Sequence, residues 1–212
     1  MKDIVILGAG ELGKELVWLI EDINRQKPTW LILGFLDDTK EKGEICHGYP
    51  VLGTMSELEE LAKQNMFYAV IALQNSTDRK RIAGLHTSFS NWTSIIHPTA
   101  VIAPGVAVGR GTIVFPQVTV SVGSSLGMHN LLYMHATVSN DCCFSDCVSV
   151  MTGVTVSEHV MIGEGSYIAA GGNIYPHVNI GAGVRIAVGN TIREDVHDGL
   201  VVGEKGKGFF FK

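Results

Sequence analysis

The second half of the chain places an apolar residue at every sixth position from Ile96 onward. The repeated positions all carry aliphatic or aromatic side chains: Ile96, Ile102, Val108, Val114, Val120, Leu126, Leu132, Val138, Phe144, Val150, Val156, Ile162, Ile168, Ile174, Ile180, Ile186 and Ile192. A second column, four residues after each, runs from Ala100 to Val196 and is mostly small or β-branched. A period of six matches no helix, so each hexad is expected to form one short strand and one turn, with both columns pointing inward. Because a single hexad cannot bury its apolar face, the pattern predicts a solenoid of stacked coils.

The N-terminal part carries a different pattern, typical of a strand, a glycine turn and a helix. Ile4–Leu7 is a short apolar run, Gly8–Gly13 has the spacing GxGxxG, and Lys14–Ile23 is amphipathic. The glycines allow a tight turn, and the start of the helix offers free N–H groups to a phosphate. The segment is short for a full dinucleotide fold, so it predicts a mononucleotide half-fold. Two alternatives remain: an NAD site, which would place Asp37 on a ribose, and a purely structural βαβ domain.

Two further strands and a helix are expected in this part. Leu31–Leu36 is an apolar run that ends at Asp37-Asp38, and Tyr68–Leu73 is a second run of the same kind. Leu58–Lys63 is predicted to be helical, with Thr54 as a candidate cap. The order of these elements favours a small βαβ-type domain.

Composition strengthens the β prediction and narrows the functional classes. Only 17% of the residues are charged, while the chain holds 25 glycines. Low charge with many glycines favours strands and tight turns over helices. The net charge of -5 and the lack of a Lys/Arg run argue against nucleic acid as a partner.

The cysteines and the N-terminus bear on location and metal chemistry. The four cysteines are Cys46, Cys142, Cys143 and Cys147. They form no CxxC pair, so reduced thiols are expected and a zinc site is not. The apolar run Ile4–Leu7 is too short for a signal peptide, and no stretch is long enough to span a membrane. We therefore expect a cytoplasmic protein without a metal.

Six motifs together resemble one family of enzymes. In chain order they are IVILGAGELGKEL, GFLDD, GYPVLG, VIAL followed by Gln74-Asn75, SIIHPTAVI and IGEGSYIAAGG. Their order over nearly the whole chain resembles the sialic-acid O-acetyltransferase and bacillosamine-pathway type of sugar acetyltransferase, in the hexapeptide-repeat superfamily. The C-terminal stretch, Val201–Gly206 with Phe209–Phe211 after it, departs from the usual ending of that family.

The resemblance implies a fold, a reaction and an assembly. The fold is an α/β N-terminal Rossmann-like half-domain over residues 1–93, followed by an all-β left-handed parallel β-helix over residues 94–212. Three hexads make each coil, and the active site lies between the subunits of a homotrimer. The reaction is O- or N-acetyl transfer from acetyl-CoA to a UDP- or other nucleotide-linked amino-sugar, for surface-glycan synthesis.

The resemblance also assigns binding residues. The nucleotide-sugar is expected at Gly8, Gly10, Glu11, Asp37, Asp38 and Asn75. Acetyl-CoA is expected at Ala170 and Gly171 on the β-helix of an adjacent subunit.

The catalytic position departs from the family. Family members have an aliphatic residue, an acid, a histidine, an acid and a cysteine in succession, and the matching segment here is Val138–Cys142. The histidine position holds Asn140, and a second family histidine would fall at Ser149. An asparagine amide is not basic, so Asn140 can hydrogen-bond a substrate or an oxyanion but cannot remove a proton near neutral pH.

Three hypotheses therefore remain open at this site. In the first, the base has moved: a coil of 18 residues places His159 directly above Asp141, and the two could form an acid-oriented histidine base. In the second, catalysis proceeds by positioning alone. In the third, the chain is a non-catalytic trimeric protein that binds a nucleotide-sugar or acts as a scaffold. His159 could also be an ordinary solvated corner residue.

Other side chains have weaker claims. His129 and His135 are expected to be turn residues, and His177 should stack above His159, with too few ligands for a metal. Tyr133 is expected to face outward at a coil corner, either packed across a trimer interface or simply exposed.

Overall fold

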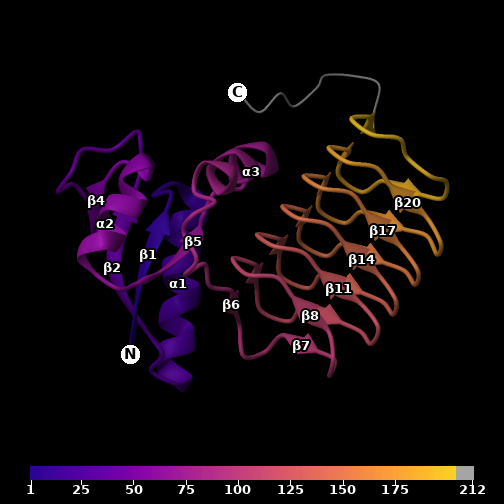
Figure 1. Cartoon of the computed structure of the whole chain (residues 1–212). Helices are drawn as coiled ribbons and strands as arrows, with labels where there is room; N and C mark the ends of the chain where they lie inside the picture. The colour runs from indigo at the N-terminus through magenta and orange to yellow at the C-terminus, as the bar shows by residue number, and fades with distance from the viewer. Residues whose placement is uncertain (204–212) are drawn as a thin grey trace.

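The computed structural model describes residues 1–203, so the expected role of the C-terminal tail beyond that point lies outside the described residues. An α/β part lies beside one side of a triangular solenoid whose coils climb away from it (Figure 1). Within residues 1–203, no helix is both long and apolar enough to cross a bilayer.

The α/β part is built on a five-stranded sheet with the order β3-β4-β2-β1-β5. Its strands are β1 (Lys2–Leu7), β2 (Trp30–Leu36), β3 (Ile45–Cys46), β4 (Tyr49–Gly53) and β5 (Tyr68–Ile71). All neighbours pair in parallel except β3 and β4, which form an antiparallel hairpin. The predicted strands are thus confirmed within one or two residues at their ends.

Two α-helices and one 3₁₀ turn connect these strands, and a third α-helix leads from β5 to the solenoid. They are α1 (Glu11–Gln26), η1 (Met55–Glu57), α2 (Leu58–Gln64) and α3 (Ser76–Leu85). Helix α1 buries its apolar face, including Leu16 and Ile20, against the sheet. The sequence predicted α1 and α2 but not α3, whose Lys- and Arg-rich stretch has little apolar periodicity.

The solenoid consists of two-residue strands arranged in three parallel sheets. The β7 sheet contains β7 (Val101–Ile102), β10 (Thr119–Val120), β13 (Thr137–Val138), β16 (Thr155–Val156), β19 (Asn173–Ile174) and β22 (Thr191–Ile192). The β8 sheet contains β8 (Ala107–Val108), β11 (Ser125–Leu126), β14 (Cys143–Phe144), β17 (Met161–Ile162) and β20 (Asn179–Ile180). The β6 sheet contains β6 (Ile95–Ile96), β9 (Ile113–Val114), β12 (Leu131–Leu132), β15 (Ser149–Val150), β18 (Tyr167–Ile168), β21 (Arg185–Ile186) and β23 (Val201–Val202).

The predicted inward columns form the core of the solenoid. Val138 lies beside Val156 on neighbouring coils, and both are fully buried with Val148, Val154 and Val160. Paired strand residues on neighbouring coils are 18 positions apart, as in Val120, Val138 and Val156, which three hexads per coil require. The six-residue period therefore predicted this half of the molecule correctly.

The last coil breaks the expected register. Val196 was predicted to continue the second column above Val178, but it pairs with Ile180 of the first column. Asp195 bonds the amide of Asn179 at a separation of 16, so this coil is two residues shorter than those below it. The Val196 side chain is buried whether it continues the second column or pairs with the first. The apolar pattern alone therefore could not distinguish a coil of 18 residues from one of 16.

The α/β part covers the first coils of the β6 sheet. Tyr133 stacks on Phe115 with ring centroids 4.5 Å apart, and its hydroxyl donates to Glu15 of α1 at 2.6 Å. Tyr133 points out of the coil as expected, but α1 of the same chain covers it, so its side chain is buried and is not exposed at a corner. His97, in the joint between the two parts, also bonds α1 through Asp22 at 2.8 Å.

Candidate active site

One corner of the solenoid, where the β7 sheet turns into the β8 sheet, carries three stacked polar residues. Asp141, His159 and His177 occupy equivalent left-handed positions on successive coils, with φ of 56°, 56° and 62°. The His159 amide donates to the Asn140 carbonyl at 3.1 Å, which fixes the spacing of the first two coils. We call this set of three residues the histidine corner.

The side chains of the histidine corner face one another. His159 Nε2 lies 3.9 Å from Asp141 Oδ2, and both side chains are half-exposed. Asn140 Nδ2 donates to the same carboxylate oxygen at 2.8 Å. The rings of His159 and His177 stack with centroids 4.9 Å apart and planes 8° from parallel. The expected proximity of Asp141 and His159 is therefore confirmed, at an ion-pair distance that is longer than a hydrogen bond.

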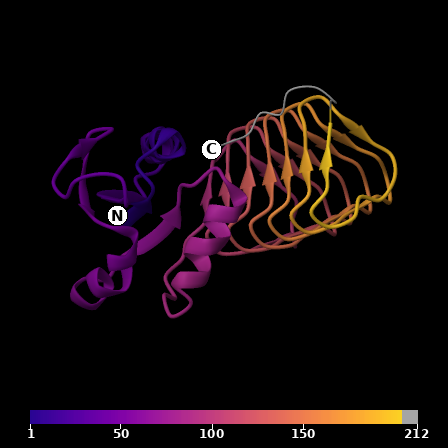
Figure 2. The ribbon, with the colours of Figure 1, turned by 90° about the horizontal axis from the view of Figure 1, so that it is seen from above.

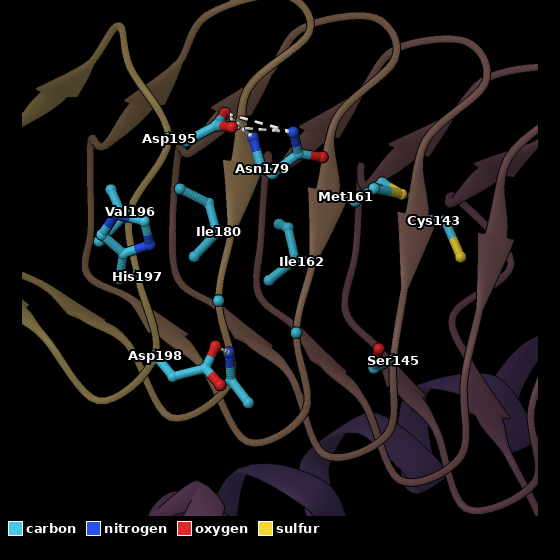
Figure 3. Close-up of a pocket in the computed structure, with 13 residues that line it drawn as sticks. Cys143, Ser145, Met161, Ile162, Asn179, Ile180, Asp195, Val196, His197 and Asp198 are labelled. Carbon is cyan, nitrogen blue, oxygen red and sulfur yellow. Dashed lines mark hydrogen bonds between the residues drawn. The ribbon is translucent and has the colours of Figure 1, made fainter.

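A groove of about 440 Å³ runs along the β8 sheet next to this corner (Figure 3). Cys143 and Met161 form part of its wall, and Gly163 and Gly181 leave its floor without side chains. Cys143 and Met161 each follow a corner residue by two positions, so the histidine corner borders the groove along its length. Such a shape suits an extended, narrow ligand.

The shortened last coil closes one end of the groove with carboxylates. Asp195 Oδ1 accepts from the Asn179 amide at 2.7 Å, and Asp198 Oδ1 accepts from the Ala182 amide at 2.8 Å (Figure 3). The backbone hydrogen bond from Asn179 lowers the pKa of Asp195. Sequence analysis missed both residues, because their place depends on the change of register.

At the glycine-rich turn, the chain leaves β1 and enters α1 through a narrow passage. A Cβ atom on Gly8, which has φ +109°, would lie 2.7 Å from the Ala72 carbonyl oxygen, so only glycine fits there. A Cβ on Gly10 would meet nothing within 4 Å. Glu11 is exposed in the first turn of α1. Within residues 1–203, no side chain caps this helix, so its first N–H groups are open to a ligand.

Asp37 does not face this open side. Its Oδ2 accepts from the Ala9 amide at 2.7 Å, and its Oδ1 accepts from the amide and hydroxyl of Thr39 at 2.8 and 2.6 Å. Burial opposes ionisation, but the bonds from Ala9 and Thr39 leave the pKa of Asp37 lowered overall. Both oxygens thus help to hold the loop, and the side chain is buried, while the role of Asp37 in binding a nucleotide stays a prediction.

Asp38 and Asn75 follow β2 and β5, the two strands that lie on either side of β1 in the sheet. Asp38 Oδ1 accepts from the Met55 amide at 2.8 Å, and Asn75 Oδ1 caps α3 by accepting from the Thr77 amide at 2.9 Å. Both side chains stay exposed. They flank the same edge of the sheet as Gly8 and Gly10.

Ser149, at the second family histidine position, is fully buried beneath α3. Its hydroxyl accepts from Arg79 at 2.7 Å, and the same guanidinium donates to the carbonyls of Leu73, His129 and Cys147. Burial lowers the pKa of Arg79 to about 10, so it remains charged at neutral pH. Ser149 therefore helps to seat the α/β part and is closed to substrate. No sequence pattern predicted this contact.

Ala170 and Gly171 lie at another corner, where the β6 sheet turns into the β7 sheet. They do not line the groove on the β8 sheet of their own chain. No cluster of three His, Cys, Asp or Glu side chains in the described part of the chain could hold a metal ion.

The fold defines a class of protein: a hexapeptide-repeat β-helix that follows an α/β domain with a glycine-rich turn between its first strand and helix. Residues 3–84 match the PglD N-terminal domain family. A UDP-N-acetylbacillosamine N-acetyltransferase of Bacillus subtilis is 28% identical over 118 residues, which are 54% of this chain and 51% of the relative. The match thus spans about half the length of that curated relative.

Solved structures match over nearly the whole chain. The acetyltransferase domain of PglB from Neisseria gonorrhoeae is 28% identical, with a TM-score of 0.84 and coverage of 95% of this chain and 96% of that domain. The same domain in complex with acetyl coenzyme A is 29% identical, with a TM-score of 0.83 and coverage of 94% and 95%. PerB from Caulobacter crescentus, in complex with CoA and GDP-perosamine, is 23% identical with a TM-score of 0.84 over 95% of this chain and 93% of PerB, and supports the fold alone.

These matches confirm the resemblance to hexapeptide-repeat sugar acetyltransferases of the bacillosamine type. They also confirm the fold class, an α/β domain followed by a left-handed parallel β-helix.

Proposed function

We propose that this protein transfers an acetyl group from acetyl-CoA to an amine or hydroxyl of a nucleotide-linked amino-sugar. The observation that carries the proposal is the likeness, over 94% of the chain, to an acetyltransferase domain that binds acetyl coenzyme A. The groove on the β8 sheet and the histidine corner beside it provide room for an extended donor and a candidate base.

The proposed chemistry uses His159 as the base. As the acceptor nitrogen or oxygen attacks the thioester carbonyl, an imidazole nitrogen of His159 takes its proton. The tetrahedral intermediate then collapses, the C–S bond breaks, and the proton passes to the departing CoA thiolate. Asp141 orients the imidazole and stabilises its charged form, while the Asn140 amide holds Asp141 and can donate to the acceptor or the oxyanion.

The two ends of the site lie on different sides of one chain. Residues 1–93, which we propose as the nucleotide-sugar domain, pack on the β6 sheet, at one side of the solenoid (Figure 2). The histidine corner of residues 94–212 lies between the β7 and β8 sheets and is therefore the corner opposite the β6 sheet. A single copy therefore cannot bring its own Gly10 to its own His159. We propose a homotrimer in which Gly8, Gly10, Glu11, Asp38 and Asn75 of one copy present the sugar to an adjacent β-helix.

Two further parts of the proposal are the residues that contact acetyl-CoA and the cellular location of the protein. Ala170 and Gly171 remain proposed contacts for acetyl-CoA, from the copy across the interface. All four cysteines are free, which suits a reducing cytoplasm, the proposed location.

A thiol-release assay with acetyl-CoA tests the proposal. The protein is incubated with a panel of UDP- and GDP-linked amino-sugars, and free CoA is measured with a thiol reagent. Turnover with at least one sugar is expected. No CoA release with any sugar, together with no acetyl-CoA binding by calorimetry, would contradict the proposal.

The non-catalytic alternative draws on Asn140 and Ser149, both of which replace family histidines. It predicts tight nucleotide-sugar binding without turnover. Burial of Ser149 under Arg79 explains that replacement as a packing change and weakens the alternative, because the residue has a structural role.

A further inference from the structure

The hairpin of β3 and β4 reaches over the glycine-rich turn through one side chain. The hairpin turns at His47-Gly48, both with positive φ, 50° and 88°. Two-residue turns of this kind favour Asn-Gly, so a histidine at the first position is unfavourable for the turn itself. The His47 ring lies edge-on to Phe35, with centroids 5.9 Å apart. A residue kept against the preference of its turn requires another reason.

We find this reason in a hydrogen bond between His47 and the backbone of Ala9. His47 Nε2 lies 2.9 Å from the Ala9 carbonyl oxygen. A carbonyl only accepts hydrogen bonds, so Nε2 carries the proton and donates it. On the other side, the Ala9 amide donates to Asp37 Oδ2 at 2.7 Å. Ala9 is therefore held at both its N–H and its C=O.

This clamp decides where the next amide points. Across a planar trans peptide, the Gly10 N–H is directed opposite to the Ala9 C=O. With the carbonyl turned to His47, the Gly10 N–H is turned away from the hairpin, together with the uncapped first amides of α1. If that peptide plane rotated, it would present an oxygen to an approaching phosphate in place of a donor.

We propose that His47 is a positioning residue for the diphosphate of the nucleotide-linked substrate. It fixes the Ala9–Gly10 peptide so that the Gly10 N–H and the start of α1 are preorganised to receive phosphate oxygens. The inference rests on the proposed function, since it assumes a nucleotide at this loop. It goes further by naming the residue that arranges the recognition of the phosphate.

The test uses the full chain with UDP and GDP as probes, measured by calorimetry. His47→Asn keeps a residue suited to the turn but removes the reach to Ala9. We expect its dissociation constant to rise about tenfold for whichever nucleotide the unmodified protein binds. His47→Gln, whose amide Nε2 can donate to the same carbonyl, is expected to recover most of the affinity. Tyr49→Phe is the matched control: it removes the hairpin's bond to Glu21 of α1 and leaves Ala9 alone.

A second readout needs no ligand. In ¹⁵N spectra of the free protein, the Gly10 amide signal should shift and exchange faster in His47→Asn and stay unchanged in Tyr49→Phe. Equal nucleotide affinity of His47→Asn and the unmodified protein overturns the positioning role alone. Failure of the unmodified protein to bind either nucleotide overturns the nucleotide proposal itself. An unmoved Gly10 signal overturns the clamp.

Discussion

At the residue scale, the proposed chemistry uses His159 as the base, one coil above Asn140, where the family has its histidine. Asn140 cannot act as a base, but the next coil brings His159 to 3.9 Å from Asp141. This proximity was predictable from the sequence, because a coil of 18 residues fixes which side chains stack. The role of Asp37 was not predictable, since it depends on how the glycine turn passes beneath it.

The relocated base predicts a selective loss of rate. His159→Ala should lower kcat by about a hundredfold or more, which is the usual contribution of a general base. His135→Ala changes an exposed histidine at a different corner and should stay within about twofold. The thiol-release assay measures both variants. Equal rates for the two would remove His159 from the mechanism.

We expect the free energy of unfolding to depend on pH through the titration of His129. Burial, with the nearby charge of Arg79, lowers the pKa of His129 from 6.5 to about 4. As pH falls from 6.5 towards 4, the unfolded chain takes up a proton that the folded chain does not, so stability decreases by up to about 3 kcal/mol.

Urea unfolding between pH 7 and pH 4.5, at one protein concentration, measures this decrease. His129→Asn keeps a residue that tolerates the left-handed backbone and removes the titrating group. Its unfolding free energy should therefore change less across this pH range. An unchanged pH dependence would show that His129 does not contribute.

At the element scale, regular features were predictable and single contacts between elements were not. Two columns at a period of six define the solenoid wherever it repeats. The shortened last coil, the covering of Tyr133 by α1 and the seating of α3 have no period of their own. Each depends on residues far apart in the chain, as Arg79 and Ser149 illustrate.

Because Arg79 of α3 bonds to Ser149, placing a histidine at position 149 is expected to affect stability differently from placing one at position 140. Ser149→His places an imidazole where the Arg79 guanidinium lies, in a fully buried site, and should lower the free energy of unfolding by roughly 3 kcal/mol. Asn140→His changes a half-buried corner position and should stay within roughly 0.5 kcal/mol. The melting temperatures of the two variants, measured by thermal unfolding, test this difference. Equal melting temperatures would mean that Arg79 does not lock α3 to β15.

At the scale of the whole molecule, the two halves of each proposed active site belong to different copies of the chain. The α/β part of a chain packs against the β6 sheet, while its histidine corner is the opposite corner of the triangle. Neither half is complete alone. The proposed mechanism therefore requires a second copy of the chain, which the proposed homotrimer supplies, and this requirement can be tested separately from the choice of sugar.

Mixed trimers provide the most direct test. One chain carries His159→Ala. The other carries Gly10→Asp, whose added side chain has open space and places a carboxylate at the proposed phosphate donors. Trimers that contain both chains are isolated with two affinity tags and assayed for CoA release. One interface in each mixed trimer pairs an intact Gly10 with an intact His159, so about one third of the unmodified activity should return. Mixed trimers as inactive as either variant alone would contradict a site shared between copies.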